Sequence, residues 1–253
     1  MNDIVFLIPI SLECPERKRN LLYQLRHLLS FDAAVYLYEC DVIQKVPDVI
    51  GDLIDKIQYK FIESSVFHRT QLLNQMVVAV NEFSIIVLHD VDVFINKQQS
   101  IDAAVKISSG ALDFCYPYTV WNKMHLADHQ PGRLWDESFE IINRSHRLSP
   151  GGSIFCRRAS FIGAGMENEN FVGWGYEDVE RFWRWTILGY KIGRIDGDLY
   201  HAEHPRPRGG SSSPGNPHCK QNKLEVEKIK RMSRPNLEQY IQTWPWLPPT
   251  GTV

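Results

Sequence analysis

Three continuous apolar runs constrain the fold of this 253-residue chain more than any other feature. They occupy residues 4–8, 34–38 and 85–88, and runs of this length are typical of strands buried on both faces of a parallel sheet. Leucines repeat at helical spacing between the first two runs, which gives a strand–helix–strand unit. The sequence therefore predicts an α/β fold with a Rossmann-like, mixed central sheet flanked by helices.

The rest of the chain carries weaker local signals. Helices are predicted near residues 50–57, 72–80, 178–188 and 224–232, and short strands near residues 59–62 and 192–200. Residues 116–150 show little periodicity, so we expect loops with short elements there. Residues 205–217 are rich in Pro, Gly and Ser and predict a flexible loop.

Composition excludes several classes of partner and location. The net charge is −2, so the chain lacks the bulk positive field that binds nucleic acid or an anionic membrane. Its apolar runs are too short for a transmembrane segment. The five cysteines are irregularly spaced, which indicates a reducing compartment rather than a disulfide framework.

Two carboxylates follow the third apolar run, in the sequence His89-Asp90-Val91-Asp92. Ligands of open α/β sheets bind beyond the carboxyl ends of the strands, so this pair is well placed for chemistry. Carboxylates bind hard divalent cations, and such a cation neutralises the leaving diphosphate of a UDP-sugar. On its own, an Asp-x-Asp at a strand end also fits a simple cap of the next element.

Two histidines three residues apart, His201 and His204, follow the last predicted strand. With Asp92 they would form a site of one oxygen and two nitrogen ligands, which suits Mn²⁺ better than Mg²⁺. A second interpretation adds His218 and Cys219 and makes a structural zinc site. Two half-exposed surface histidines are the third possibility.

A third constellation is Gly173-Trp174-Gly175-Tyr176-Glu177-Asp178. The glycines give a bendable turn that carries a large apolar side chain. The two carboxylates then lie at a helix N-terminus, where the helix dipole favours their ionised form. An ionised Asp178 could act as general base toward an acceptor hydroxyl, whereas the alternative is a plain helix cap with a core Trp.

Taken together, these pieces resemble the β-1,4-galactosyltransferase family and its bacterial relatives, including the second domain of chondroitin-synthase-like polymerases. The resemblance covers the chain from about residue 4 to residue 206, and the last three matching segments are specific in their order and spacing. The matching segments are Ile8-Pro9 with Arg17 and Arg19, Phe67-x-Arg69-x-x-Leu72-Leu73-Asn74, His89-Asp90-Val91-Asp92, Gly151-Gly152-Ser153, Trp174-Gly175-Tyr176-Glu177-Asp178 and His204-Pro205-Arg206.

The resemblance implies a GT-A fold, an inverting mechanism and roles for individual residues. Asp178 would be the catalytic base, and Asp92, His201 and His204 would be the metal ligands. The implied acceptor-binding residues are Glu177, Trp174 and Tyr176. The implied donor-binding residues are Pro9, Arg17, Arg19, Arg69, Asp90, Gly151, Gly152 and Ser149.

The same resemblance implies a division of the single domain, residues 1–253. Residues 1–95 would be the nucleotide-binding half and residues 96–210 the half for donor sugar and acceptor. Residues 205–217 would be a flexible lid over the donor, since a lid needs low local stability, and residues 218–253 a C-terminal appendage.

Two of the departures from the family pattern concern the acceptor and donor sites. Tyr176 stands where the family has a small glycine, so the acceptor mouth differs. Ser149 stands where the animal enzymes carry a Tyr that crowds the C2 group of the donor. A smaller side chain leaves room for an N-acetyl group, so both UDP-Gal and UDP-GalNAc remain candidate donors.

The sequence as a whole predicts an inverting, Mn²⁺-dependent glycosyltransferase. It would move Gal or GalNAc from a UDP-sugar to a saccharide acceptor, with a lipid-linked acceptor as one option. By analogy it would act in surface polysaccharide synthesis, in the cytoplasm or peripherally at the inner membrane face. The alternatives are a non-catalytic sugar-binding relative and a zinc-stabilised interaction module.

Overall fold

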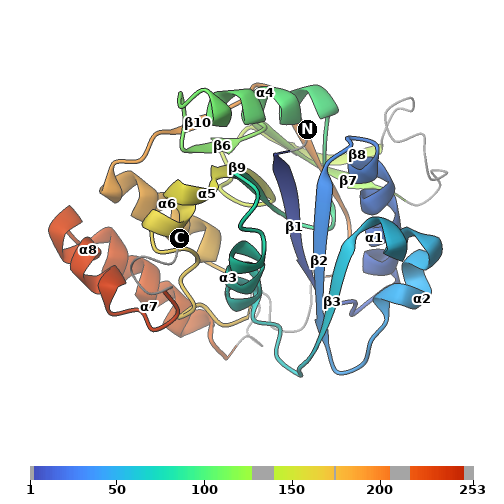
Figure 1. The fold of residues 1–253 in the computed structure, drawn as a ribbon, viewed down its shortest axis with the longest axis horizontal. Helices are drawn as coiled ribbons and strands as arrows, with labels where there is room; N and C mark the ends of the chain where they lie inside the picture. Colours follow the sequence, from blue (N-terminus) through green and yellow to red (C-terminus); the bar gives the residue numbers. More distant parts are fainter. Residues whose placement is uncertain (1–2, 127–139, 174, 206–216, 248–253) are drawn as a thin grey trace.

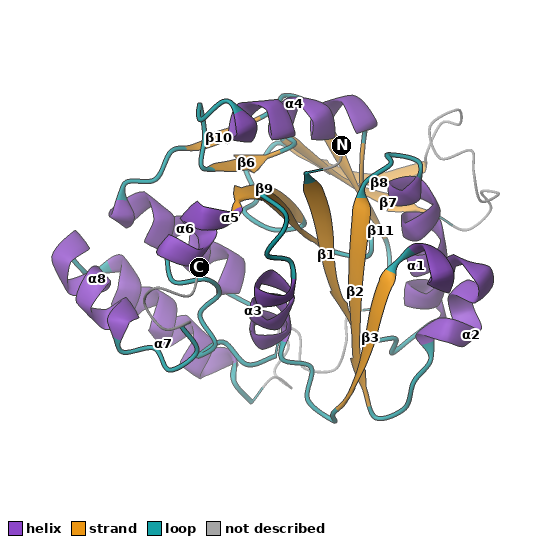
Figure 2. Ribbon diagram, viewed as in Figure 1, coloured by secondary structure: helices purple, strands orange, loops and turns teal. Residues whose placement is uncertain are grey.

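The computed structural model describes residues 3–126, 140–173, 175–205 and 217–247. At its centre is a seven-stranded sheet with the strand order β10-β6-β9-β4-β1-β2-β3 (Figures 1 and 2). Neighbouring strands run parallel except β9, which is antiparallel to both β4 and β6. The strands are β1 (Ile4–Ile10), β2 (Ala34–Asp41), β3 (Gln58–Glu63), β4 (Ile85–His89), β6 (Phe114–Tyr116), β9 (Ser153–Arg157) and β10 (Ile192–Arg194). The predicted mixed central sheet is therefore confirmed.

Helices cover both faces of this sheet. On one face lie α1 (Pro15–Leu29), α2 (Val46–Ile50) and α4 (Lys97–Ser108). The other face is covered by α3 (Arg69–Ala79), α5 (Arg158–Gly163), α6 (Glu177–Leu188), α7 (Cys219–Lys230) and α8 (Arg234–Gln242). In Figure 1, α1 and α2 lie to the right of β1 and β2, the helices of the second group lie to the left, and α4 runs along the top.

The apolar run of β1 explains this two-sided arrangement. Successive side chains of a strand point to opposite faces. Val5 and Leu7 pack into the core beneath α3 and α6, whereas Ile4, Phe6 and Ile8 pack into the core beneath α1 and α4. Burial of both faces is the reason why the run is apolar throughout rather than alternating.

A second sheet of four strands, in the order β5-β11-β7-β8, adjoins the carboxyl end of β4. It consists of β5 (Val93–Ile95), β7 (Val120–His125), β8 (Glu140–Ser145) and β11 (Asp198–Ala202). In the register of β11 with β5, His201 lies opposite Val93. The amide of Ala202 also donates to the carbonyl of Asp92 at 2.8 Å, so this pairing brings the two metal-ligand motifs together.

The secondary structure differs from the sequence-based expectation in several places. Residues 116–150 contain two strands of the second sheet, β7 and β8. Their side chains are mostly polar and the pairing has a bulge at Lys123 and Met124, so the sequence lacks the alternation of apolar and polar residues that identifies a strand. The helix expected at residues 50–57 is α2 followed by a 3₁₀ helix, Gly51–Lys56. The helices α4, α5 and α8 were not predicted, because they are short or rich in polar residues.

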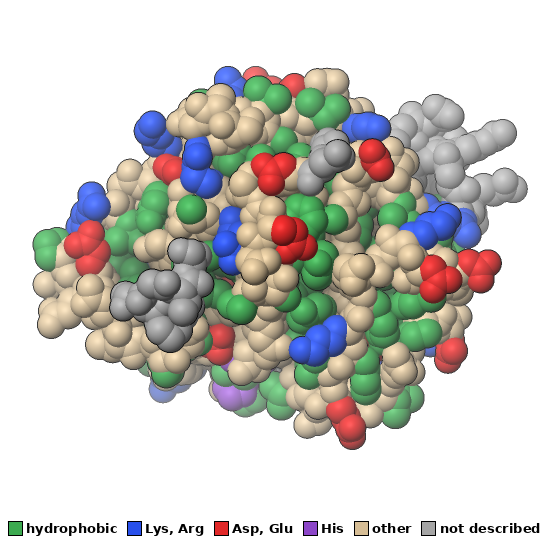
Figure 3. Space-filling view, in the orientation of Figure 1, with side chains coloured by type: hydrophobic (Ala, Val, Ile, Leu, Met, Phe, Trp, Pro, Cys, Tyr) green, Lys and Arg blue, Asp and Glu red, His purple; other side chains and the backbone are tan. Residues whose placement is uncertain are grey.

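Other local predictions are confirmed. The helix predicted at residues 178–188 is α6, and Gly189 ends it with a left-handed φ of 82°. None of the five cysteines, all of which lie in the described part of the chain, forms a disulfide bond, as the sequence predicts. Among the described residues, no helix is long and apolar enough to cross a membrane. Figure 3 shows acidic and basic side chains interspersed over the face in view, in keeping with the small net charge.

The two C-terminal helices belong to the main core. Val226 of α7 is buried, and Ile229, Leu237, Ile241 and Trp244 lie in the same apolar cluster as the side chains of α3 and α6. The functional division of the chain at residues 95, 210 and 218 stays a prediction.

Candidate metal and active site

Asp92, His201 and His204 converge at the junction between the two sheets. Asp92 lies just before β5, His201 lies in β11, and His204 follows that strand. One ligand atom of each lies within 4.8 Å of the others. The Nε2 atom of His204 is 2.7 Å from Oδ2 of Asp92, and Nε2 of His201 is 3.6 Å from Oδ1. The three predicted ligands can therefore share one ion.

The two imidazoles are held in orientations that suit metal binding. The ring of His201 stacks on Trp121 of β7, with centroids 5.1 Å apart and planes inclined by 29°. The Nδ1 atom of His204 donates to the carbonyl of Pro205 at 2.9 Å. Nδ1 is thus occupied as a donor, and Nε2 is the ring atom that faces Asp92 and would bind a metal ion after losing its own proton.

The electrostatics of this cluster favour an ionised carboxylate. Burial acts to raise the pKa of Asp92, but His201, His204 and Arg17 hold it well below its usual range. Burial lowers the pKa of His201, which favours the neutral imidazole that binds metals. Burial also acts on His204, but its hydrogen bond with Asp92 raises the pKa above the ordinary value.

Of the three residues predicted near β1 to hold the nucleotide, one faces the metal-ligand cluster. Arg17 is buried in α1, donates to the carbonyl of Ser11 at 3.4 Å, and acts electrostatically on Asp92. Arg19 is half-buried, and its charge acts on Glu16. Pro9 is buried within β1, opposite Tyr38 in the register with β2.

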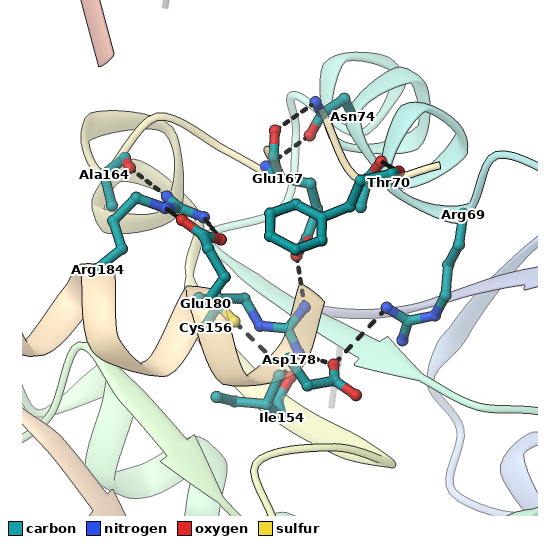
Figure 4. Close-up of polar contacts among 12 residues, drawn as sticks. Arg69, Thr70, Asn74, Ile154, Cys156, Ala164, Glu167, Asp178, Glu180 and Arg184 are labelled. Atoms are coloured by element: carbon teal, nitrogen blue, oxygen red, sulfur yellow. Dashed lines mark hydrogen bonds and ion pairs between the residues drawn. The ribbon is translucent and has the colours of Figure 1, made fainter. Parts of the chain in front are cut away.

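Arg69 connects the Asp-x-Asp motif to the predicted base. It is 3% exposed and begins α3. Its Nη2 lies 2.8 Å from Oδ1 of Asp90, and its Nη1 lies 3.8 Å from Oδ1 of Asp178. Figure 4 shows Arg69 reaching from α3 toward Asp178 at the start of α6. The structure thus places a guanidinium between two carboxylates that are 88 positions apart in sequence, a contact that only the tertiary fold creates.

The glycine pair Gly151-Gly152 lies between Asp178 and Asp90. A Cβ atom at Gly151 would lie 2.6 Å from Oδ2 of Asp178, so this position cannot carry a side chain without displacing the carboxylate. Gly152 has a φ of 85°, and its carbonyl accepts from the amide of Asp90 at 2.8 Å. Both glycines are therefore required by geometry.

The backbone of Ser149 fixes the loop that carries these glycines. Its carbonyl accepts from the hydroxyl of Tyr118 at 2.9 Å and from Nη2 of Arg194 at 2.8 Å. Its side-chain oxygen accepts from the amide of Gly151 at 3.3 Å. Neither Tyr118 nor Arg194 was predicted from the sequence, because both lie outside the recognised motifs.

The carboxylates at the start of α6 have different environments. Asp178 has a side chain 26% exposed, whereas Glu177 is 5% exposed. The Oε2 atom of Glu177 accepts from the amide of Gly175 at 2.7 Å. Burial, and then the charge of Asp178, raise the pKa of Glu177 to about 7. The pair therefore combines an accessible carboxylate with a buried one that can carry a proton near neutral pH.

Tyr176 retains a backbone conformation that suits the glycine found in the family pattern. Its φ is 73°, in the left-handed region that costs a non-glycine residue about 1 kcal/mol. The turn that precedes it is held from α7, where Nδ2 of Asn222 donates to the carbonyls of Val172 and Gly175 at 3.1 and 3.2 Å. Trp174 and residues 206–216, with most of the predicted lid, lie outside the described residues.

Asp178 has a second cationic partner that sequence reasoning missed. Arg181, one turn further along α6, donates from Nη2 to Oδ1 of Asp178 and from Nη1 to Oε1 of Glu167 at 2.7 Å. The i, i+3 spacing of Asp178 and Arg181 is a signal that the sequence did contain. The contact with Glu167 could not have been inferred, because Glu167 lies in a connection without periodicity.

The described residues offer no support for the zinc alternative. The one group of three or more potential ligands found among them is Asp92, His201 and His204. His218 and Cys219 lie at the start of α7 and do not join it.

Part of the chain matches a model of a known protein family. A family model described as the N-terminal domain of galactosyltransferase matches residues 137–206. This segment contains the glycine loop, Asp178 and both histidine ligands. No curated protein matches the chain.

Solved structures resemble the whole fold. A fragment of S. aureus TarS, residues 1-349, in complex with UDP-GlcNAc superposes with a TM-score of 0.64 at 11% identity, covering 94% of this chain and 70% of that chain. GalNAc-T7 with UDP, GalNAc and Mn²⁺ gives a TM-score of 0.61 at 13% identity, covering 96% of this chain and 51% of that chain. At such low identity these similarities establish the fold alone.

The family match and the fold agree with the resemblance found in the motifs. The predicted α/β architecture of GT-A type is confirmed by the mixed sheet and by these structural neighbours. The chain therefore has a GT-A fold, and its residues 137–206 match the family model of the N-terminal domain of galactosyltransferase.

Proposed function

We propose that this chain is an inverting, metal-dependent hexosyltransferase that moves Gal or GalNAc from a UDP-sugar to a hydroxyl group of an acceptor sugar. One observation carries the proposal. The loop of Gly151 and Gly152 joins the two halves of the site, because Gly151 abuts Oδ2 of Asp178 and Gly152 binds the backbone of Asp90. A candidate base and a candidate metal site thus lie on either side of one glycine loop.

The donor set of the cluster fits a divalent transition metal. One carboxylate and two imidazoles suit Mn²⁺ better than Mg²⁺, which prefers oxygen throughout. Asp92, His201 and His204 would hold the ion, and buried Asp92 is kept ionised for it. When bound, the ion would neutralise negative charge on the departing diphosphate.

The protein groups account for the remaining chemistry. Asp178 takes the proton of the acceptor hydroxyl as that oxygen attacks the anomeric carbon from the face opposite UDP. A single displacement inverts the configuration and gives a β-linkage from an α-linked donor. No protein acid is needed, because UDP leaves as an anion.

The remaining site residues divide into those that would bind the donor and those that would bind the acceptor. Arg17, Arg69 and Asp90 line the nucleotide side, and Arg69 also reaches Asp178. Pro9 and Arg19 are assigned to the donor by family resemblance. Glu177, Tyr176 and Trp174 would contact the acceptor.

Donor identity is proposed as UDP-Gal or UDP-GalNAc. The small side chain of Ser149 supports room for an N-acetyl group. The TarS structure with UDP-GlcNAc and the GalNAc-T7 structure with UDP, GalNAc and Mn²⁺ support a donor of the N-acetylhexosamine class. Assembly of a surface polysaccharide on a lipid-linked acceptor, at the cytoplasmic face of a membrane, is our proposal for the setting, by analogy alone.

The decisive test is the variant Asp178→Asn, assayed with a panel of UDP-sugars for Mn²⁺-dependent UDP release. We expect UDP and Mn²⁺ to bind normally, while transfer falls by about 10²–10⁴-fold, the usual contribution of a general base. Asp196→Asn is the matched control, because Asp196 is exposed in the turn between β10 and β11. Normal turnover by the Asp178→Asn enzyme would end the proposal. Tight, stoichiometric zinc in the purified protein would favour an interaction module instead.

A further inference from the structure

We infer that Arg181 is a positioning residue for the reaction, because it holds Oδ1 of Asp178 and leaves Oδ2 as the oxygen that receives the proton. This inference rests on the proposed function, since it assigns a supporting group to the proposed base. It concerns a residue outside the motifs that carry the family resemblance.

Both halves of the Arg181 guanidinium are engaged. Nη2 donates to Oδ1 of Asp178, and Nη1 donates to Oε1 of Glu167 at 2.7 Å. Arg181 and Glu167 each have side chains only 1% exposed. A planar guanidinium that binds one carboxylate through each end loses little further freedom, so it fixes direction as well as charge.

Apolar packing removes the remaining freedom of Arg181. Its Cζ atom lies 5.5 Å from the ring centroid of Trp185. That ring is stacked on Phe114, with centroids 3.6 Å apart and planes inclined by 3°. Trp185 and Phe114 are both fully buried in the main core. The position of the guanidinium is thus set by the core of the protein.

The two oxygens of Asp178 have different surroundings as a result. Oδ1 receives Nη2 of Arg181 and lies 3.8 Å from Nη1 of Arg69. Oδ2 lies against the backbone of Gly151, where a Cβ would approach to 2.6 Å. Within the described part of the chain, no donor is recorded for Oδ2. The geometry therefore directs one lone-pair-bearing oxygen toward the glycine loop that separates it from the metal-ligand cluster.

The same helix offers a matched control. Arg184 is as deeply buried as Arg181 and lies about one turn further along α6. Its Nε donates to Oε1 of Glu180 at 2.7 Å, and its Nη1 donates to the carbonyl of Ala164. Figure 4 shows this Arg184–Glu180 pair apart from Asp178. Loss of either guanidinium disturbs a buried ion pair, but only Arg181 contacts the proposed base.

The test compares Arg181→Lys with Arg184→Lys in the full chain. Lysine keeps the charge but has a single nitrogen in place of the two Nη atoms with which Arg181 binds Glu167 and Asp178 separately. We expect Arg181→Lys to lower kcat by roughly 10–100-fold, as for other small misplacements of a catalytic group, with the KM of the donor unchanged. Arg184→Lys should keep the wild-type kcat at temperatures where it is folded, as judged by its Tm.

Equal kcat values for the two lysine variants, both folded, would overturn the inference. Should Arg181→Lys not fold, Glu167→Gln provides the second test. It loosens the far end of the Arg181 guanidinium while leaving Asp178 and Arg181 in place. A lower kcat with an unchanged donor KM supports the inference, and a wild-type kcat contradicts it. Failure of the proposed function is distinguishable, because Asp178→Asn would then also retain turnover.

Discussion

At the scale of single residues, the start of α6 concentrates opposing charges in a small volume. Two buried guanidiniums, from Arg69 and Arg181, approach one carboxylate oxygen of Asp178. Neighbouring Glu177 is buried and has its pKa raised to about 7, first by burial and then by Asp178. The pKa of Glu177 therefore differs between the folded and the unfolded protein. Because of this difference, the protonation of Glu177 is coupled to the stability of the fold.

Glu177 should therefore make stability depend on pH. Its folded-state pKa is above the ordinary value of 4.5, so its contribution is fully present below pH 4.5. As the pH rises toward about 7, the unfolded chain loses the proton first, and the folded state loses stability by up to about 1.4 kcal/mol per pH unit. Glu177→Gln, which mimics the neutral form, should lack this loss.

Urea unfolding of the wild-type and Glu177→Gln proteins between pH 4.5 and pH 8, in the presence of a chelator, measures the effect. The difference in free energy of unfolding should shift in favour of Glu177→Gln as the pH rises and then level off. A difference that stays constant over this range would contradict the assignment.

At the scale of elements, α7 holds the turn that precedes α6, the helix that carries the proposed base. Asn222 is 1% exposed and binds the carbonyls of Val172 and Gly175, on either side of the glycine-flanked position. Asn168, in the adjoining connection, donates to Glu225 of the same helix at 2.9 Å. Besides packing into the core, α7 thus holds the segment of residues 168–175 that leads to α6.

Asn222→Ala should loosen this turn. Each lost hydrogen bond in a buried position costs about 1–3 kcal/mol when the partner is left unsatisfied. We expect Asn222→Ala to lower the free energy of unfolding. Hydrogen exchange should be faster at the amide of Gly175, which donates to Glu177 in the unsubstituted protein. The neighbouring exposed residue gives the control variant Gln221→Ala. Unchanged exchange at Gly175 in Asn222→Ala would show that α7 does not hold the turn.

At the scale of the whole molecule, the metal-ligand cluster links two sheets. Asp92 follows β4 of the central sheet, and the histidines come from the end of β11 in the second sheet. Asp92 lies more than 100 positions before the two histidines in sequence, so the unfolded chain does not hold the three proposed ligands together. A ligand that binds only the folded state stabilises it by mass action.

Manganese should therefore raise the Tm of the chain. At a free Mn²⁺ concentration of about 100 times Kd, the stabilisation is about 2.7 kcal/mol, which corresponds to roughly 5–10 °C for a chain of this size. His204→Ala should abolish most of this shift, whereas His146→Ala, at an exposed position after β8, should retain it. Scanning calorimetry over a series of Mn²⁺ concentrations makes the comparison. An equal shift in both variants would place the ion elsewhere.

The sequence by itself determined the features that depend on neighbouring residues. The apolar runs at β1, β2 and β4 predicted the buried strands, and the helical period followed by Gly189 predicted α6. The spacing of His201 and His204 and the Asp-x-Asp after β4 predicted three candidate ligands, Asp92, His201 and His204, and these side chains converge in the structure. Periodicity and short spacing are local properties, so they can be read from the chain directly.

Only the tertiary structure decided which distant groups meet. The pairing of β5 with β11, the contact of Arg181 with Glu167 and the reach of Arg69 to Asp178 join segments with no local pattern in common. The same holds for the strands β7 and β8, whose polar side chains suit a second sheet that local periodicity does not reveal. Such contacts form because packing both faces of the central sheet brings those segments together, and no short stretch of sequence encodes that packing.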